Sequence, residues 1–371
     1  MNRGSNYIRG LFPEVALLSS LIISTERRLT MNIVPKAAWL TVNRACNFRC
    51  KWCYAKGTDF DDKQTLTMDL ALRLLSIVRD LGIKNITLIG GEPTLWKHLM
   101  DFNIKCREIG MQTTLITNAY RFGDNDYWDK YIKYSNDKVG ASLKAFDVDS
   151  ATELAGIRDF EVLKIGLQRM TSCFKGGISF LCNSFVNNDL MSLARTAYEC
   201  GARSILIGPC TPSFINGKVD ATGMLPLKEL VASVVSQYSE MNTLFVGKLT
   251  FAIKTPLCIW PISFIEKLID RKQLRNTCQF QHRSGIIFDP KGQVLACNSM
   301  VDFPIGMIDK DYSDAESMIK LFNADTVVND YNHINSYPSK RCVSCSHASI
   351  CGGGCPLIWA VYNAKESIPG W

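Results

Sequence analysis

Residues 46–54 read CNFRCKWCY and place three cysteines within eight positions, at Cys46, Cys50 and Cys53. Thiolates are the soft ligands that iron–sulfur clusters prefer, and three of them on one short loop suit three irons of a [4Fe–4S] cube. The fourth iron is then left open. This spacing predicts a cluster that binds and reduces a substrate or a cofactor, rather than one that only transfers electrons.

Outward from this loop, the chain alternates short apolar runs with longer helical patterns from residue 37 to residue 212. Such alternation is typical of a parallel sheet with crossover helices. Six runs have strand character, at residues 38–42, 86–89, 113–116, 139–144, 178–185 and 204–207. Six strand–helix units are too few for a closed eight-stranded barrel, so we expect an α/β fold with a partial, open (β/α)6 TIM-like barrel.

Polar or glycine-rich motifs follow the ends of these runs. They are the cysteine loop, Gly90-Gly91-Glu92-Pro93, Thr117-Asn118, Ser142 to Lys144, and Pro209-Cys210. The carboxyl ends of parallel strands gather at one rim of such a sheet, and ligands bind there. We therefore expect these motifs to form one site.

The alternation of strand and helix patterns fades after residue 212. Near residue 275 the sequence changes to short strand patterns, turns and cysteines. We expect a lead-in at residues 1–36, the barrel at 37–212, a connecting helical region at 213–275 and a small cysteine-rich domain at 276–371. The connecting region shows helical patterns near 226–240 and 261–272. A hairpin is predicted from Ile286 to Ala296, turning at Asp289-Pro290-Lys291-Gly292.

The composition is that of a folded, water-soluble protein, with 47% hydrophobic and 21% charged residues among 371. The formal charge of +7 comes from scattered Lys and Arg. Without a dense basic run and interleaved aromatic residues, we expect no nucleic-acid partner.

Fifteen cysteines are many for this length. The apolar segment at residues 15–23 lacks a basic start and a cleavage site, and it is too short to span a bilayer. We interpret it as an N-terminal helix packed on the body. We expect a cytoplasmic protein with reduced thiols and no membrane association, in which clustered cysteines bind metal.

The C-x3-C-x2-C loop, with Trp52 before its last cysteine, resembles that of the radical S-adenosylmethionine (radical SAM) enzymes. The stretch Gly90-Gly91-Glu92-Pro93 resembles the glycine-rich motif with which this family holds the methionine amino group of its cofactor. The resemblance implies a [4Fe–4S] cluster at Cys46, Cys50 and Cys53 whose open iron binds S-adenosylmethionine. It also implies reductive cleavage of this cofactor to a 5′-deoxyadenosyl radical. A zinc loop is the alternative for the three cysteines alone.

Four polar residues stand where the family contacts the ribose and carboxylate of the cofactor, namely Thr117, Asn118, Ser142 and Lys144. Residues 142–147 also look like the corresponding stretch of glycyl-radical activating enzymes, whose lysine contacts that carboxylate. Cys210 is a candidate hydrogen-atom donor to a substrate radical. The alternatives are that the four polar residues are ordinary loop residues and that Cys210 is an inert, partly buried thiol.

The C-terminal cysteines resemble the SPASM domain, which binds auxiliary iron–sulfur clusters. By the ligation of that family, the inner cluster would use Cys278, Cys297 and Cys355, and the outer one Cys342, Cys345 and Cys351. The family pattern has a further cysteine downstream and another near Cys278, and both are missing here, although Cys258 could reach back to the inner cluster. We therefore expect one or two auxiliary [4Fe–4S] clusters, each open at an iron or completed by another ligand. A zinc knuckle formed by Cys342, Cys345, Cys351 and Cys355 is the alternative.

The SPASM resemblance implies a peptide maturase or oxidoreductase that modifies a ribosomally made peptide or protein by hydrogen-atom abstraction. The product would be a crosslink, a thioether, an epimer or an oxidised residue. Cys297 is followed by Asn298, where the sulfatase-maturing enzymes have an acidic base. Since an amide cannot take a proton as a carboxylate can, this argues against that activity.

The expected partners are the peptide and an electron donor such as flavodoxin or ferredoxin. A separate leader-peptide-binding protein is also possible, because only 36 residues precede the first strand. One alternative is a radical SAM dehydrogenase or rearrangement enzyme acting on a small molecule. An alternative of another class is a metal-binding module without catalysis.

Overall fold

Six parallel strands follow one another across the sheet in the order in which they occur in the chain. The computed structural model, which describes residues 33–276 and 278–370, thereby confirms the predicted α/β fold with an open barrel. The apolar segment at residues 15–23 lies outside the described residues. The strands are β1 (Ala37–Thr41), β2 (Asn85–Ile89), β3 (Gln112–Thr117), β4 (Lys138–Ser142), β5 (Ile178–Cys182) and β6 (Ile205–Pro209).

Five further strands extend this sheet at both edges. Beyond β6 lie β9 (Leu249–Ala252) and β10 (Leu274–Arg275), and beyond β1 lie β11 (Gly285–Phe288), β12 (Gln293–Leu295) and β13 (Pro304–Met307). The order β10-β9-β6-β5-β4-β3-β2-β1-β11-β12-β13 has two ends, so the sheet is not closed. The antiparallel β11–β12 pair is the predicted hairpin. The sequence analysis missed β9 and β10, because four and two residues are too few to show an apolar period.

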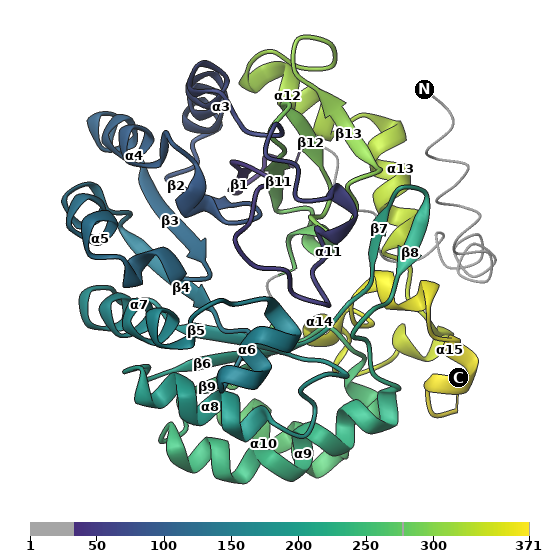
Figure 1. Ribbon diagram of the computed structural model, residues 1–371. Coiled ribbons are helices and arrows are strands. Elements are labelled where there is room, and N and C mark those ends of the chain that lie inside the picture. The colour runs from purple at the N-terminus through teal and green to yellow at the C-terminus, as the bar shows by residue number, and fades with distance from the viewer. Residues whose placement is uncertain (1–32, 277, 371) are drawn as a thin grey trace.

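Helices cover the outer side of the arc of strands (Figure 1). The barrel helices include α3 (Met68–Asp80), α4 (Leu99–Glu108), α7 (Phe160–Cys173) and α8 (Leu190–Glu199). The helical patterns predicted near 226–240 and 261–272 are α9 (Leu227–Leu244) and α10 (Ile262–Asp270). Thr67 caps the start of α3, because its side chain accepts a hydrogen bond from the amide of Leu70. The short helices α5 (Asn125–Tyr131) and α6 (Val148–Ala155) were not predicted. Among the described helices, none is both long and apolar enough to span a membrane.

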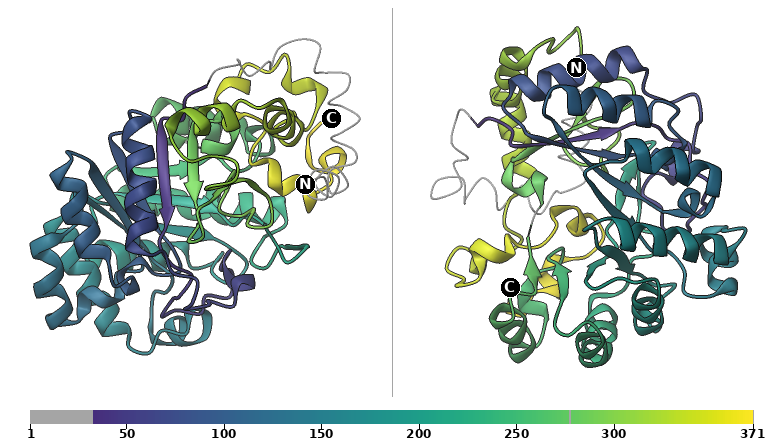
Figure 2. Two further views of the ribbon diagram at one scale, coloured as in Figure 1. Left: turned by 90° about the horizontal axis from the view of Figure 1, so that it is seen from above. Right: turned by 90° about the vertical axis from the view of Figure 1, so that its left-hand side faces the viewer.

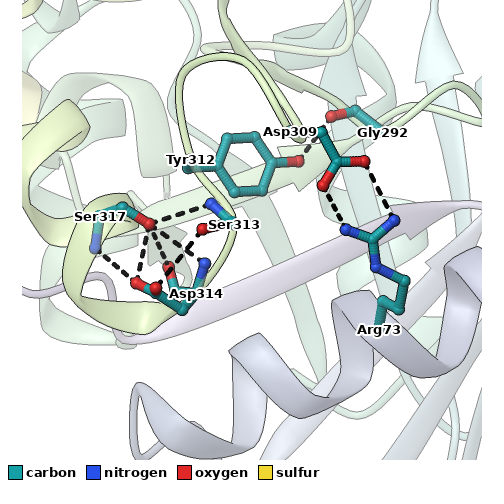
Figure 3. Close-up of polar contacts among 7 residues, drawn as sticks. All are labelled: Arg73, Gly292, Asp309, Tyr312, Ser313, Asp314 and Ser317. Carbon is teal, nitrogen blue, oxygen red and sulfur yellow. Dashed lines mark hydrogen bonds and ion pairs between the residues drawn. The ribbon is translucent and has the colours of Figure 1, made fainter.

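The C-terminal region docks on the barrel through the loop after β13 (Figure 3). Arg73 of α3 donates two hydrogen bonds to the Asp309 carboxylate, one of them 3.1 Å long. Tyr312 donates to the carbonyl oxygen of Gly292 in the β11–β12 turn at 2.5 Å. Asp314 and Ser317 form a capping box that begins α12 (Ala315–Phe322), and α13 (Asp325–Ile334) follows.

The remaining elements lie on the side of the molecule away from the helices α3 and α4 (Figure 2). They are α11 (Gln279–His282), α14 (Ala348–Cys351), α15 (Ala364–Ser367) and the hairpin of β7 (Ser213–Ile215) with β8 (Lys218–Asp220). Asn216, at the tip of this hairpin, donates to the carbonyl oxygen of Gly57 at 2.9 Å. The hairpin therefore covers the segment that follows the cysteine loop. The domain boundaries at 36, 212 and 275 stay a prediction.

Candidate functional site

The cysteine loop lies inside the arc of strands, directly after β1 (Figure 1). Its backbone is fixed to the end of α6, since the amide of Arg49 donates to Ala155 at 2.7 Å and that of Lys51 donates to Leu154 at 3.0 Å. The Arg49 guanidinium also donates to the carbonyl oxygen of Cys46 at 2.5 Å. Helix α6 was not predicted, and it holds the loop in place.

The glycine-rich turn after β2 packs against the start of this loop. The amide of Gly91 donates to Asn43 at 2.9 Å, and that of Glu92 donates to Ala45 at 2.8 Å. A Cβ atom on Gly91 would lie 2.2 Å from the carbonyl oxygen of Arg44, which is backbone and cannot move aside. Glycine is therefore required here for a close approach of two backbones.

The buried Glu92 carboxylate joins the ends of β2 and β3. One of its oxygens accepts hydrogen bonds from the amide and hydroxyl of Thr94 and from the Thr117 hydroxyl at 2.6 Å. The other accepts from the amide of Asn118 at 2.7 Å. Burial raises the pKa of Glu92, and these donors partly offset the shift. The side chain of Glu92 thus positions the turn.

Asn118 connects the third strand to the cysteine loop. Its side-chain amide donates to the side chain of Asn47 at 2.8 Å, while its own oxygen accepts from the amide of Tyr120 at 3.0 Å. Tyr54, directly after the last cysteine, has its hydroxyl 3.4 Å from the carbonyl oxygen of Gly90. Asn47 and Tyr54 were not predicted as site residues, although Asn47 lies within the cysteine motif and Tyr54 follows it.

Lys144 brings a positive charge to the thiols of Cys50 and Cys53. It follows β4 and donates to the Ser142 hydroxyl at 2.6 Å. Burial raises the pKa of Cys50 to about 11, and the charge of Lys144 partly offsets this. Burial, and then the charge of Glu92, raise the pKa of Cys46 to about 12. The two thiols therefore hold their protons at neutral pH in the metal-free protein, and iron must displace these protons to bind.

The residues at this rim fit an iron–sulfur cluster with an anionic or zwitterionic ligand. Three thiols on one loop supply soft ligands, and the neighbouring Lys144 supplies a counter-charge. Among the described residues, no three His, Cys, Asp or Glu side chains converge on the position of a single metal ion. A [4Fe–4S] cluster instead takes its thiolates around a cube.

Cys210 is buried at the end of β6, on the same side as Lys144. Its sulfur lies 3.7 Å from the carbonyl oxygen of Thr222. Burial raises the pKa of Cys210, whereas the charges of Lys254 and Lys144 lower it. The charges of both lysines therefore reach Cys210. Lys254 was not predicted as a site residue, because β9 before it went unrecognised.

Cys278, Cys297 and Cys355 form the inner C-terminal set. Burial, and then the charges of Cys278 and Cys297, raise the pKa of Cys355 to about 12. Lys254 lowers the pKa of all three thiols. The amide of Cys355 donates to the carbonyl oxygen of Lys254 at 2.9 Å. Cys355 thus stands with Cys278 and Cys297, which is not the grouping that the zinc-knuckle alternative requires.

The outer C-terminal set lines a cavity of about 560 Å³ near the surface. Its thiols belong to Cys342, Cys345, Cys351 and Cys258. Cys258 was considered a residue that could reach back to the inner set, whereas it lines the outer cavity in the structure. Cys258 lies in the single-turn helix η5 (Leu257–Ile259), and the amide of Leu257 donates to the Cys351 sulfur at 3.3 Å.

The four remaining cysteines lie away from these sets. Cys106, Cys182 and Cys200 are buried as small core residues, whereas Cys173 is exposed.

Residues 40–182 match the model of the Radical SAM superfamily. This chain carries a radical SAM domain. The matched residues begin in β1 and end with β5, so they include the cysteine loop, the glycine-rich turn and the Thr117, Asn118 and Lys144 positions. The SPASM resemblance concerns residues outside this match and stays a prediction.

Curated relatives of the radical SAM domain include GTP 3′,8-cyclases. The enzyme of Helicobacter pylori (strain HPAG1) is 28% identical over 151 residues, which are 40% of this chain and 46% of that protein. A probable GTP 3′,8-cyclase of Thermococcus kodakarensis is 26% identical over 129 residues, or 35% and 41% of the two chains. The chain thus spans less than half the length of these relatives.

Solved structures share the fold over more of the chain. The crystal structure of Streptococcus suis SuiB bound to the precursor peptide SuiA is similar with a TM-score of 0.62 and 17% identity, over 90% of this chain and 74% of that one. Native anSMEcpe with bound AdoMet is similar with a TM-score of 0.59 and 15% identity, over 86% of this chain and 89% of that one. At such identities the likeness shows the fold alone.

Proposed function

We propose that this protein is a radical SAM enzyme that modifies a ribosomally made peptide or protein by hydrogen-atom abstraction. Cys46, Cys50 and Cys53 would hold a [4Fe–4S] cluster, and S-adenosylmethionine would bind beside it. Together these groups would supply a 5′-deoxyadenosyl radical. The observation that carries the proposal is that hydrogen bonds tie the ends of β2 and β3 to the cysteine loop within a radical SAM domain.

The chain's own residues would bind and orient the cofactor. Glu92 and Asn118 fix the glycine-rich turn and the end of β3 relative to the thiols, so the backbone at this rim is arranged before the cofactor binds. Lys144 offers its ammonium group to the cofactor's carboxylate. Cys210 is buried on the same side and has a thiol hydrogen that a substrate radical could take. Gly90, Gly91 and Pro93 shape the turn.

A peptide substrate is proposed because the shared fold covers 90% of this chain in SuiB, which was crystallised with its precursor peptide. The C-terminal cysteine sets, which the SPASM resemblance would fill with auxiliary clusters, lie next to the barrel through Lys254 and Cys355. Flavodoxin or ferredoxin would supply the electron, and a separate protein could bind the leader of the precursor.

A second candidate is a reaction on a small molecule. The observation that favours it is the similarity of the radical SAM domain to GTP 3′,8-cyclases, which exceeds 25% identity. The two candidates differ in their substrate and share the cleavage of S-adenosylmethionine.

The test of the shared step is anaerobic reconstitution with iron, sulfide, S-adenosylmethionine and a chemical reductant. We expect 5′-deoxyadenosine, measured by liquid chromatography. Cys50→Ala should reduce this product to background and still retain iron at the C-terminal sets, because only the first site loses a ligand. Cys173→Ala is the matched control, since this exposed cysteine lies in α7. If the wild type, fully loaded with iron and sulfide, leaves S-adenosylmethionine intact, the proposed enzymatic activity is refuted. That result would favour a metal-binding module without catalysis.

The test of the substrate is co-expression with the peptide encoded beside this protein, followed by mass spectrometry of that peptide. A mass change that requires Cys50 supports the peptide. An unchanged peptide, together with consumption of GTP or another small molecule by the loaded enzyme, supports the second candidate.

A further inference from the structure

We propose that Cys258 is the fourth protein ligand of the outer auxiliary iron–sulfur cluster, beside Cys342, Cys345 and Cys351. The inference rests on the proposed function only in that the C-terminal cysteines bind clusters. It assigns to the outer set a ligand from the loop after β9.

The first observation is that the four thiols line one cavity. This cavity of about 560 Å³ lies between η5 and the segment at residues 341–353. The cysteines of the inner set do not line it. Four thiolates close the shell of a [4Fe–4S] cluster, whereas three leave one iron open.

The second observation is that η5 already contacts the outer set through its backbone. The amide of Leu257, the residue before Cys258, donates to the Cys351 sulfur at 3.3 Å. Amide donors to ligand sulfurs are usual outer-shell partners of such clusters. Cys258 itself lines the same cavity as the three other thiols.

The third observation explains how the segment at residues 254–258 reaches both sets. At the start of this segment, the carbonyl oxygen of Lys254 accepts a hydrogen bond from the amide of Cys355 at 2.9 Å. Gly354 has a φ of +80°, and a Cβ atom there would lie 2.8 Å from the backbone at Thr255 and Pro256. The close approach at this glycine fixes the segment, so that Lys254 faces the inner set and Cys258, four residues later, faces the outer one.

The inner set then keeps three thiols, at Cys278, Cys297 and Cys355. Cys258 cannot serve both sets, because it lines the outer cavity and these three do not. The shortage of ligands therefore falls on the inner set, next to Lys254.

The test compares Cys258→Ala in two cluster-deficient backgrounds of the full chain, loaded with iron and sulfide under anaerobic conditions. One background carries Cys278→Ala with Cys297→Ala, and the other carries Cys342→Ala with Cys345→Ala. Iron and acid-labile sulfide per chain are measured, with electron paramagnetic resonance of the reduced samples. In the first background, Cys258→Ala leaves the outer cluster with three thiols and one open iron, so it should change the electron paramagnetic resonance spectrum of the reduced sample and release up to about four irons where the open cluster degrades. In the second background it should remove none.

The reverse pattern, or an unchanged iron content together with an unchanged spectrum in both backgrounds, would overturn the assignment. Zinc without sulfide at the outer set would also overturn it, because zinc does not form the proposed cluster. Cys173→Ala, at another exposed cysteine, should keep all the iron in both backgrounds. These results are independent of 5′-deoxyadenosine formation, so failure of the proposed function is seen separately.

Alkylation provides a readout that does not depend on folding of the Cys258 variant. Cys258 and Cys173 are both exposed in the cluster-free structure. In the loaded wild type, iodoacetamide should modify Cys173 and spare Cys258, and Cys258 should become reactive in the background without Cys342 and Cys345. If Cys258 reacts as fast as Cys173 in the loaded wild type, the proposal is wrong.

Discussion

Four donors converge on the buried Glu92 carboxylate, and each of its oxygens accepts from one backbone amide. A glutamine has one oxygen and one NH2 group, so it can accept from only one of these two amides. The arrangement therefore requires a carboxyl group, even though burial raises its pKa.

Glu92→Gln should lower the free energy of unfolding by about 1–3 kcal/mol, the cost of one buried amide left without an acceptor. It should also weaken binding of S-adenosylmethionine, because the ends of β2 and β3 lose their connection. Urea unfolding and equilibrium dialysis measure the two effects. Glu199→Gln, at an exposed residue, should change neither the free energy of unfolding nor the binding of S-adenosylmethionine. Unchanged stability and binding in Glu92→Gln would contradict the positioning role.

Gly91→Ala should separate the glycine-rich turn from the cysteine loop, because the new Cβ atom would lie 2.2 Å from the Arg44 carbonyl oxygen and 2.3 Å from that of Ala45. We expect a loss of stability of about 1–3 kcal/mol, typical of overpacking against a rigid neighbour, and loss of cofactor binding. The control is Gly177→Ala, where the nearest atom would be 3.5 Å away. Equal cofactor affinity in the two variants would show that the close approach is not required.

At the scale of elements, the β11–β12 turn depends on the Asp289 side chain. Its Oδ1 accepts hydrogen bonds from the amides of Lys291 at 2.9 Å and Gln293 at 2.8 Å. Burial raises the pKa of Asp289 above its ordinary value of 3.8. The folded protein therefore holds this proton more tightly than the unfolded chain, and the contribution of Asp289 to stability falls as the pH rises through the raised pKa.

Asp289→Asn keeps the accepting oxygen and removes the titration. Compared with this variant, the wild type should lose stability as the pH rises above 3.8. The difference in the free energy of unfolding between the two proteins should level off once Asp289 is ionised in both the folded and the unfolded state. Urea unfolding of both proteins over a pH series measures this difference. A wild type that gains stability relative to Asp289→Asn over that interval would show that the pKa is lowered instead.

At the scale of the whole molecule, β1 joins the barrel to the C-terminal region. It pairs in parallel with β2 on one side and with β11 on the other. The contact of Arg73 with Asp309 adds a second connection between the two regions (Figure 3). Because the sheet is continuous, we expect the two regions to unfold together.

Leu40→Ala tests this cooperativity, since Leu40 in β1 is fully buried. It should lower the free energy of unfolding by about 2–5 kcal/mol and leave one transition. Circular dichroism and tryptophan fluorescence should report the same midpoint in urea. Val148→Ala, at a side chain 62% exposed, should change stability by no more than about 0.5 kcal/mol. Two separate transitions would show that the regions fold independently.

The sequence by itself determined the six barrel strands, the cysteine loop and the motifs at the strand ends, because each is a local pattern a few residues long. The resemblance to the SPASM domain implied two sets for the C-terminal cysteines, which stay a prediction as metal ligands. Only the tertiary structure decided where Cys258 lies, how Glu92 is used and that Lys254 stands beside the inner set. The grouping of thiols depends on the path of the chain in space. The strand β9, too short to leave a periodic signal, sets that path by bringing residues 254–258 between the two sets.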